Sequence, residues 1–510
     1  MDNFYIITVT VFIRKVKTKS GAIAVQVARR NAGRDMVLKH LGSAHSKREL
    51  DRFIQLAQQH IRAGQQSLFD DTVPLLDIVA LHSSSVFLYE TLSHCYNFLN
   101  FDQLDDSIFK QLVIVRLIEP ASKLDTIRIL SELGVNTPSN TGIHRCLQRV
   151  IAKNYRDQIC KLCFQTVQPQ SLSLLLYDVT TLYFEIQKED EFRKPGLSKE
   201  RRLEPQIVIG LLVDRTGFPL ELHEFEGNTA ETKTIVPVIT QFCQKHHLTT
   251  TQMTITADAG MLSANNLKEL EAAGFYFIVG SRLSKTPYQI TEHTKSHPDE
   301  QLTDGQIFET THSFGYKKED KIKRRVIYQY KEKRAQLDLN NIEKQVAKAQ
   351  RVVSGSTPVK KVTFLEIKGQ IKKLNQKLID EHRLRAGIKG YVTNLPTVQE
   401  DHKQGVPPQE IINAYHQLFQ VEKSFRMSKS DLKARPIFHH KLDAIKARLT
   451  IVFTALSIAR HIERKTSLST KKFIQKLRVI QTPTVRINGK VMQIQPEIGK
   501  DVENLISLLF

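Results

Sequence analysis

The sequence predicts an α/β protein organised around one mixed β-sheet, with mainly helical segments before and after it in the chain. Residues 171–282 decide this, because three strand-like runs are followed by a helix, a short strand, a second helix and a last strand. A basic interruption over 283–388 comes next, and residues 390–394 then have the pattern of a strand that returns to the same sheet. The order β-β-β-α-β-α-β begins with an antiparallel meander, so it excludes a doubly wound parallel sheet.

Each element of this order has a local signature. The strands are rich in Leu, Ile, Val, Tyr, Phe and Thr, residues 214–217 form a turn, Ser263 is a good N-cap, and Gly274 ends a helix. In chain order the expected elements are strands 172–184, 206–213 and 218–225, helix 232–246, strand 253–257, helix 264–273 and strand 275–279.

The chain before this core is expected to begin with short strands and continue as helices. Ser46-Lys-Arg-Glu49 is a capping box, which opens a helix that extends to about residue 62. The pattern is mostly helical from 74 to 153, where helices 122–133 and 142–152 form either a helix-turn-helix or an ordinary hairpin of a helical bundle. The expected N-terminal strands are 9–16, 23–28 and 37–41, and the basic residues of the second hairpin helix are Arg145, Arg149 and Lys153.

After the returning strand, two prolines at 407–408 begin a helix expected to run to about residue 428. A long apolar helix over 442–462 follows, and Asn488-Gly489 is the favoured pair for a type I′ hairpin turn. The chain therefore divides into N-terminal strands with a helix (1–70), a helical region (71–165), the sheet core (166–282 and 389–462), the basic insertion (283–388) and a C-terminal helix and hairpin (463–510).

The charge balance favours a polyanionic partner. The 510 residues include 74 Lys and Arg against 53 Asp and Glu, a formal net charge of +21. Residues 317–385 alone carry 20 Lys and Arg against 8 Asp and Glu. Cations placed on phosphates release condensed counterions, and nucleic acid, an anionic membrane face or an acidic protein would each satisfy the surplus. A basic run of this kind is also typical of a solvated helical face.

Other classes of protein are disfavoured by composition. The longest apolar runs, such as 451–459 and 4–13, have only about ten residues, too few to span a bilayer, so no membrane partner is expected. Five cysteines are too few for a disulfide framework and indicate a reducing cytoplasm. The lone pair Cys160 and Cys163 is expected to be two ordinary thiols, because zinc spacing needs a second pair of ligands.

Two acids stand in unusual places. Asp178 lies inside an otherwise apolar strand, where a charge is costly unless it is paired or coordinated, and Asp258 ends the strand 253–257. The first and fourth strands of such a sheet can be neighbours, so the two carboxylates are candidates for one site. Neighbouring carboxylates repel each other, and a divalent metal ion resolves that conflict. For either acid alone, a satisfied structural role is equally compatible with the sequence.

A third acid comes from the helix after Pro408. Tyr415, Glu422 and Lys429 are seven residues apart, so a continuous helix places them on one face. Three carboxylates are hard oxygen ligands that suit Mg²⁺ or Mn²⁺. Two such ions would activate a water and stabilise the leaving oxygen of a phosphodiester. Taken alone, the helix is also compatible with a solvated face on which Glu422 pairs with Arg426.

Together these residues resemble the DDE transposases of bacterial insertion sequences, whose core is RNase H-like. The helix is similar to the Tyr-x2-Arg-x3-Glu-x6-Lys signature of one branch, and here it is Tyr415-His-Gln-Leu418-Phe-Gln-Val-Glu422-Lys-Ser-Phe-Arg-Met-Ser-Lys429. Leu418 departs from the signature by replacing its Arg, so Arg426 or Lys423 would have to supply that cation. The resemblance covers roughly residues 171–462, insertion included.

The resemblance implies cutting of the DNA at the ends of an insertion sequence and joining of the 3′-OH ends to target DNA. Asp178, Asp258 and Glu422 would be catalytic and would hold two Mg²⁺ (or Mn²⁺) ions. The partners would be double-stranded DNA, as terminal inverted repeats and as target, and a second copy of the chain in a synaptic homodimer at the nucleoid. The expected DNA-binding residues are Tyr415, Lys423, Arg426, Lys429, Lys323, Arg324 and Arg325, and the helical region 71–165 would bind the DNA ends.

Two alternatives stay open on the sequence alone. A nuclease of the same RNase H-like fold would cut without joining strands. A decayed copy would bind DNA without catalysis, although the presence of all three acids favours an active enzyme.

Overall fold

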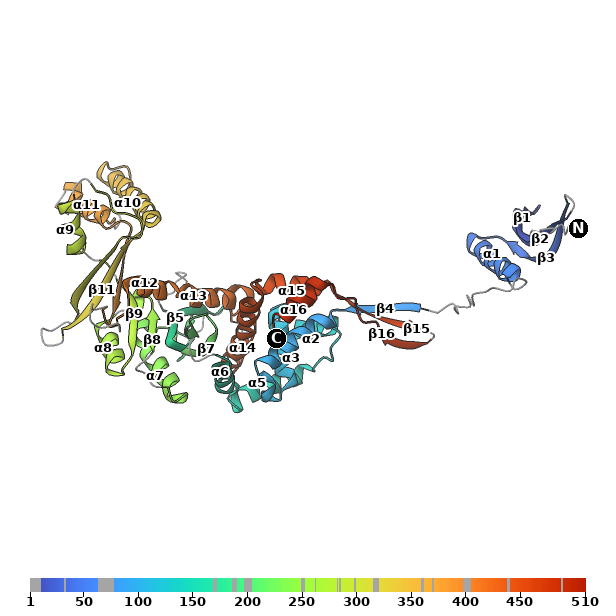
Figure 1. Ribbon diagram of the computed structural model, residues 1–510, viewed down its shortest axis with the longest axis horizontal. Coiled ribbons are helices and arrows are strands. Elements are labelled where there is room, and N and C mark those ends of the chain that lie inside the picture. The colour runs from blue at the N-terminus through green and yellow to red at the C-terminus, as the bar shows by residue number, and fades with distance from the viewer. Residues whose placement is uncertain are drawn as a thin grey trace, which may run out of the picture. The chain divides into compact units, whose positions relative to one another are not determined.

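The structure is a computed structural model that divides into two compact units (Figure 1). One unit comprises Met1–Leu81 and Val485–Met492, and the other comprises His82–Thr484 and Gln493–Phe510. The residues described are 11–31, 34–62, 78–167, 172–185, 190–196, 204–248, 253–261, 263–281, 283, 286–297, 300–314, 321–358, 362–368, 371–397, 405–437, 441–487 and 489–510.

The first unit is a small antiparallel sheet with one covering helix. The strands β1 (Val11–Lys17), β2 (Ile23–Asn31) and β3 (Arg34–Ala44) pair in the order β1-β2-β3, and α1 (Lys47–Arg62) packs against all three. The predicted capping box is confirmed, because the Glu49 amide donates to Ser46 Oγ at 3.2 Å and the Ser46 amide donates to Glu49 Oε2 at 3.3 Å. Residues 9–10 of the first expected strand and most of the run 4–13 lie outside the described residues.

A second small sheet has the order β16-β15-β4. Its strands are β4 (Ile78–Ser84), β15 (Thr482–Ile487) and β16 (Lys490–Gln493). The predicted hairpin between β15 and β16 is confirmed, and Gly489 has the positive φ of 81° that a type I′ turn requires. Asn488 lies outside the described residues.

The predicted helical region forms a bundle around one long helix. The central helix α14 (Leu442–Thr466) contacts α2, α3, α5 and α6, and its residues 449–462 are buried. The hairpin of α4 and α5 is therefore part of a bundle, which favours the second of its two interpretations. The helices are α2 (Val86–Phe98), α3 (Ser107–Ile118), α4 (Lys123–Glu132), α5 (Asn140–Ala152), α6 (Tyr155–Thr166), α15 (Thr470–Arg478) and α16 (Lys500–Ser507).

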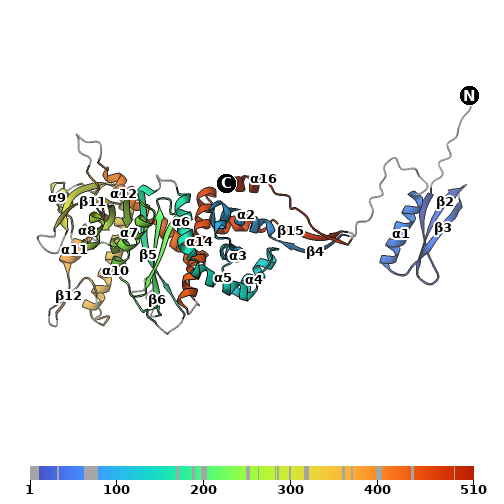
Figure 2. The same cartoon turned by 90° about the horizontal axis from the view of Figure 1, so that it is seen from below.

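The main sheet has eight strands in the order β10-β11-β14-β9-β8-β5-β6-β7 (Figures 1 and 2). The predicted element order over 171–282 is present: β5 (Leu174–Tyr183), β6 (Gln206–Asp214) and β7 (Pro219–Glu226) are antiparallel, and β8 (Thr254–Ala257) and β9 (Tyr276–Ser281) follow. The helices α7 (Ile235–Lys245) and α8 (Ala264–Ala272) connect β7, β8 and β9. Because β5 pairs in parallel with β8, the meander and the later strands form one continuous layer.

The basic segment 283–388 is less separate than expected. Its strands β10 (Ile307–Phe314) and β11 (Ile322–Tyr330) extend the main sheet, because β11 pairs with the returning strand β14 (Ile388–Thr393). A small outer core of Ile342, Val346, Ala349, Phe364 and Ile379 belongs to the remainder of the segment. That remainder contains α9 (Tyr288–Ser296), α10 (Glu332–Val353), β12 (Leu365–Lys368), β13 (Ile371–Leu374) and α11 (Gln376–Leu384).

The single helix expected from Pro408 to about residue 428 is instead divided. The helix α12 (Pro408–His416) ends, α13 (Phe419–Arg426) begins after a tight turn, and a π-helical segment Met427–Asp431 follows. Within the turn, the amides of Leu418 and Gln420 bond to carbonyls three residues earlier, the tighter pattern of a 3₁₀ turn. Both helices lie along one face of the main sheet, while α7 and α8 lie on the other (Figure 1).

All five cysteines are buried with free thiols, and burial raises the pKa of Cys163 to about 12. Within the described ranges, none of the helices combines the length and apolar character needed to cross a membrane.

Candidate active site

Asp178 and Asp258 come from neighbouring strands that pair in parallel. In the register of β5 and β8, Leu176 is paired with Thr256. Asp178 lies two residues after Leu176, and Asp258 lies two residues after Thr256. Because strand side chains alternate between faces, the same register places both carboxylates at one level and on one face of the sheet. Asp178 is half-buried and Asp258 is exposed at the end of β8. The pairing confirms that the first and fourth strands of the predicted order are neighbours.

Tyr415 contacts Asp258 directly. Its hydroxyl donates a hydrogen bond to Asp258 Oδ1 at 3.1 Å, and only 4% of the residue is exposed. Gly280 of β9 makes room for it, because a Cβ there would lie 2.6 Å from the Tyr415 hydroxyl. Burial, followed by the charge of Asp258, raises the pKa of Tyr415, which keeps the hydroxyl protonated and able to donate. The DNA contact that the resemblance implies for Tyr415 stays a prediction, and within the protein its hydroxyl bonds to a carboxylate.

Lys389 of β14 lies on the other side of this tyrosine. Its Nζ is 4.4 Å from the centroid of the Tyr415 ring, a cation–π contact. Burial and the charge of Arg334 lower the pKa of Lys389, and the charges of Asp258 and Glu422 oppose this. Sequence reasoning missed Lys389. Its only signal was a position directly before the strand predicted at 390–394.

Glu422 is exposed on α13, which packs on β5 and β6. Its charge raises the pKa of Tyr415 and opposes the lowering of the Lys389 pKa, as the charge of Asp258 also does. The same two side chains therefore respond to both acids. Among the described residues, however, no three His, Cys, Asp or Glu side chains are grouped so that they could hold a metal ion by themselves.

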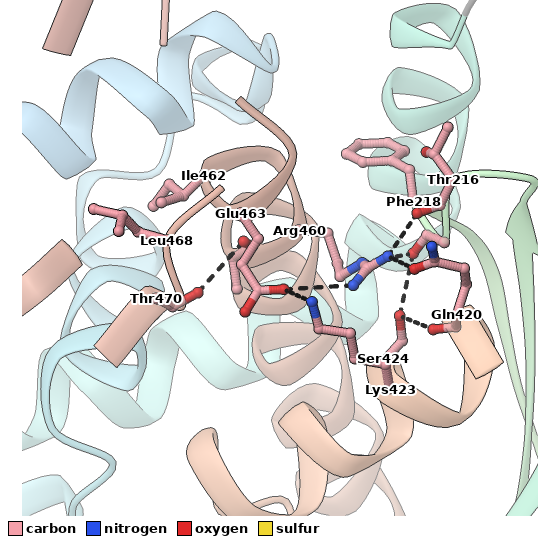
Figure 3. Close-up of polar contacts among 12 residues, drawn as sticks. Thr216, Phe218, Gln420, Lys423, Ser424, Arg460, Ile462, Glu463, Leu468 and Thr470 are labelled. Atoms are coloured by element: carbon pink, nitrogen blue, oxygen red, sulfur yellow. Dashed lines mark hydrogen bonds and ion pairs between the residues drawn. The ribbon is translucent and has the colours of Figure 1, made fainter. Parts of the chain in front are cut away.

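A buried arginine fixes the position of α13 (Figure 3). Arg460 of α14 donates to the carbonyls of Thr216 at 2.6 Å and Gly217 at 3.1 Å, in the turn between β6 and β7. It also donates to Gln420 Oε1 at 2.6 Å, and Ser424 Oγ donates to the Gly217 carbonyl at 3.1 Å. Gln420 and Ser424 lie on either side of Glu422 in the sequence, so the Arg460 contacts hold the segment that carries this acid.

Glu463 extends these contacts to a second cation. It pairs with Lys423 at 2.7 Å and with Arg460 at 3.5 Å. Lys423 was expected to bind DNA, but this ion pair ties it to α14 (Figure 3). A charged residue within the apolar helix 442–462 was the only sequence signal for Arg460.

The other expected cations of this helix differ in accessibility. Leu418, at the position of the missing Arg, is buried and packs in the main core. Arg426 is exposed, and Lys429 is half-buried in the segment Met427–Asp431. Tyr415 is buried, whereas Glu422, seven residues later and beyond the break at Leu418, is exposed.

Three cations of the basic segment 283–388 were expected to bind DNA, and they differ in exposure. Lys323 is exposed, but Arg324 is 2% exposed and makes two hydrogen bonds with Glu271, at 2.9 and 2.7 Å. Arg325 is 7% exposed and pairs with Glu309 at 2.6 Å. The expectation for Arg324 and Arg325 is therefore corrected, because β11 is an internal strand and their guanidinium groups are used within the protein.

A cleft of about 590 Å³ opens beside Asp258. Its walls come from β9, β14, α10, α11 and α12. Its charged lining consists of Asp258, Arg334, Asp338, Arg385 and Lys389, with His382 beside them. The cleft therefore joins the candidate carboxylates to the basic segment.

Replacing Arg324 by Ala should lower the free energy of unfolding by about 3 kcal/mol, because Glu271 loses its buried partner. The matched control is Lys323→Ala, on the same strand but exposed, which should change stability by less than about 0.5 kcal/mol. Chemical denaturation measures both values. Equal effects of the two substitutions would contradict a structural role for Arg324.

Replacing Arg460 by Ala should also cost about 3 kcal/mol of stability, because Glu463 and two carbonyls lose a buried donor. Arg460→Lys should recover little, since one ammonium cannot serve the separate acceptors that the guanidinium reaches. Lys472→Ala, at an exposed position of α15, is the control and should leave stability nearly unchanged. Thermal unfolding measures these effects. The same melting temperature for Arg460→Ala and Lys472→Ala would contradict the role of Arg460 in holding α13.

Comparisons with known proteins identify the family of the chain. Residues 169–458, more than half of the chain, match the family described as transposase DDE domain. No curated protein matches the sequence significantly. One similar solved structure is the cryo-EM structure of a piggyBac transposase synaptic complex with hairpin DNA, with 12% identity, a TM-score of 0.39, and coverage of 78% of this chain and 79% of that chain. On the family match, this chain belongs to the transposases that carry a DDE domain.

Proposed function

We propose that this transposase cuts DNA at the ends of an insertion sequence and joins the freed 3′-OH ends to target DNA. The register of β5 and β8 carries the proposal, because it brings Asp178 and Asp258 to one level of one sheet face. The strand order β7-β6-β5-β8-β9, with α13 over β5, supports an RNase H-like core for the same chemistry.

Asp178, Asp258 and Glu422 are the residues proposed to hold two Mg²⁺ or Mn²⁺ ions. Their donors are all carboxylate oxygens, which hard divalent cations prefer. Mg²⁺ commonly takes one or two carboxylates together with waters and substrate phosphates, so a preformed cage of three protein ligands is not required. Such ions supply an activated water and neutralise charge at the leaving oxygen.

The remaining residues have supporting roles in this proposal. The Tyr415 hydroxyl orients Asp258 through its hydrogen bond, and the Arg460 contacts hold the segment that carries Glu422. Arg426, Lys429 and Lys323 are proposed to contact backbone phosphates, which position the DNA without reading its sequence.

The DNA partner follows from charge and from the reaction. A formal charge of +21 favours association with the phosphate backbone. We propose that the helical region 71–165 binds the terminal inverted repeats, and that two copies of the chain hold two ends together before joining. In this proposal the main sheet and α13 carry the residues that cut and join the DNA.

The proposal predicts nicking of a duplex that carries the element's inverted repeats only when Mg²⁺ or Mn²⁺ is present. Asp178→Asn, Asp258→Asn and Glu422→Gln should each abolish nicking and preserve DNA binding, because each removes a metal ligand but no phosphate contact. Asp443→Asn, an exposed acid of α14, is the matched control and should retain activity. A fully active variant would remove its residue from the proposed site.

A joining assay with precut 3′-OH ends separates transposition from simple cleavage. Strand-transfer products that depend on the same three acids are expected. Cleavage without joining would instead identify a nuclease.

A further inference from the structure

The cleft beside Asp258 has an excess of positive charge. Lys389, Arg334 and Arg385 face it, and Asp338 is the one acid besides Asp258 among the residues that line it. Its volume of about 590 Å³ falls within the range of roughly 300–1,000 Å³ that is usual for sites of small ligands. A part of a DNA strand would fit a site of this size and charge.

Lys389 is the cation of this cleft that contacts Tyr415, the residue bonded to Asp258. Its ammonium lies over the Tyr415 ring, whose hydroxyl bonds to Asp258, so the two contacts link the lysine to the carboxylate. Lys389 is half-buried, yet it makes no ion pair within 4.0 Å with any acid of the described part of the chain. Partial burial without a close counter-ion is costly for an ammonium, and an anionic ligand would relieve that cost.

Arg334 adds a second cation on the same side. It lies on α10, its ion pair with Asp338 is loose at 3.5 Å, and about half of its side chain is exposed. Its positive charge is one of the influences that lower the pKa of Lys389, which indicates that the two cations repel each other across the cleft. Because both cations line one cleft, their combined positive charge favours an anionic ligand there.

We propose that Lys389, together with Arg334, binds a phosphodiester of the DNA strand next to the bond that is cut. The assignment rests on the proposed function, and it deepens that function by placing the DNA backbone between β14 and α10. An ammonium is well suited to this task, because it acts as a point charge toward a phosphate oxygen. Lys389 would thus position the strand relative to Asp258 without touching the reacting atoms.

The test pairs a protein variant with a neutral phosphate in the DNA. Full-length protein is titrated in EDTA with duplexes that carry the inverted repeats and a single methylphosphonate, moved one position at a time around the cut site. At one position next to the cut, neutralisation should weaken binding of the unmodified protein about ten- to hundredfold, the usual range for a hydrogen bond to a charged group. Lys389→Gln should bind unmodified DNA more weakly by the same factor. Neutralising that phosphate should then weaken the binding of Lys389→Gln no further.

Additional variants make the result independent of folding. Arg334→Gln changes a half-exposed residue and should show the same coupling with the same or the adjacent phosphate. Lys389→Arg keeps the charge and should restore most of the binding, whereas Lys472→Gln, on α15 and outside the cleft, should show no coupling at any position.

Two outcomes would overturn the assignment. If every methylphosphonate weakens DNA binding by Lys389→Gln and by the unmodified protein by the same factor, Lys389 binds no phosphate. If thymidine 5′-monophosphate saturates the cleft while DNA binding is unchanged in Lys389→Gln, the ligand is a small anion and not the DNA strand. Absence of DNA binding by the unmodified protein would contradict the proposed function itself, whereas binding without coupling would contradict only the role of Lys389.

Discussion

The candidate site depends on the parallel pairing of β5 with β8, two strands that are separated in the sequence by β6, β7 and α7. The register of this pair brings Asp178 and Asp258 to one level, and every other contact of the site is arranged around that pair. Tyr415 bonds to the second acid, Lys389 lies over the tyrosine ring, and Arg460 fixes the helix that carries Glu422. A shift of one residue in this register would place one carboxylate on the opposite face of the sheet.

Most of the fold could be predicted from local patterns. Apolar runs predicted the strands from β5 to β9, Ser46 and Glu49 form the expected cap, and β15 and β16 form the expected hairpin, with Gly489 at a positive φ. The division of the helix at Leu418 was not predictable from spacing, because no Gly or Pro marks it in the sequence.

The sequence singled out the acids of the candidate site but not the residues that surround them. Asp178 and Asp258 were found because a charge at the centre or end of an apolar strand is unusual. Arg324 and Arg325 were misjudged, because a run of like charges gives no indication that two members pair with acids on other elements, Glu271 and Glu309. Lys389 had no motif at all. Its contact with Tyr415 exists only through the tertiary fold, since β14 is brought beside β9 by long-range pairing.

The pairing of β11 with β14 means that the basic segment is not an interchangeable cassette. Cutting out residues 283–388 would remove two strands from one side of β14, leave its backbone amides and carbonyls without partners, and take away the cleft wall opposite Lys389. A recombinant chain with a shorter or foreign segment at this point would therefore need to supply a replacement edge strand. Variation in length is more easily accommodated further out, in the part that has its own small core around Ile342 and Phe364.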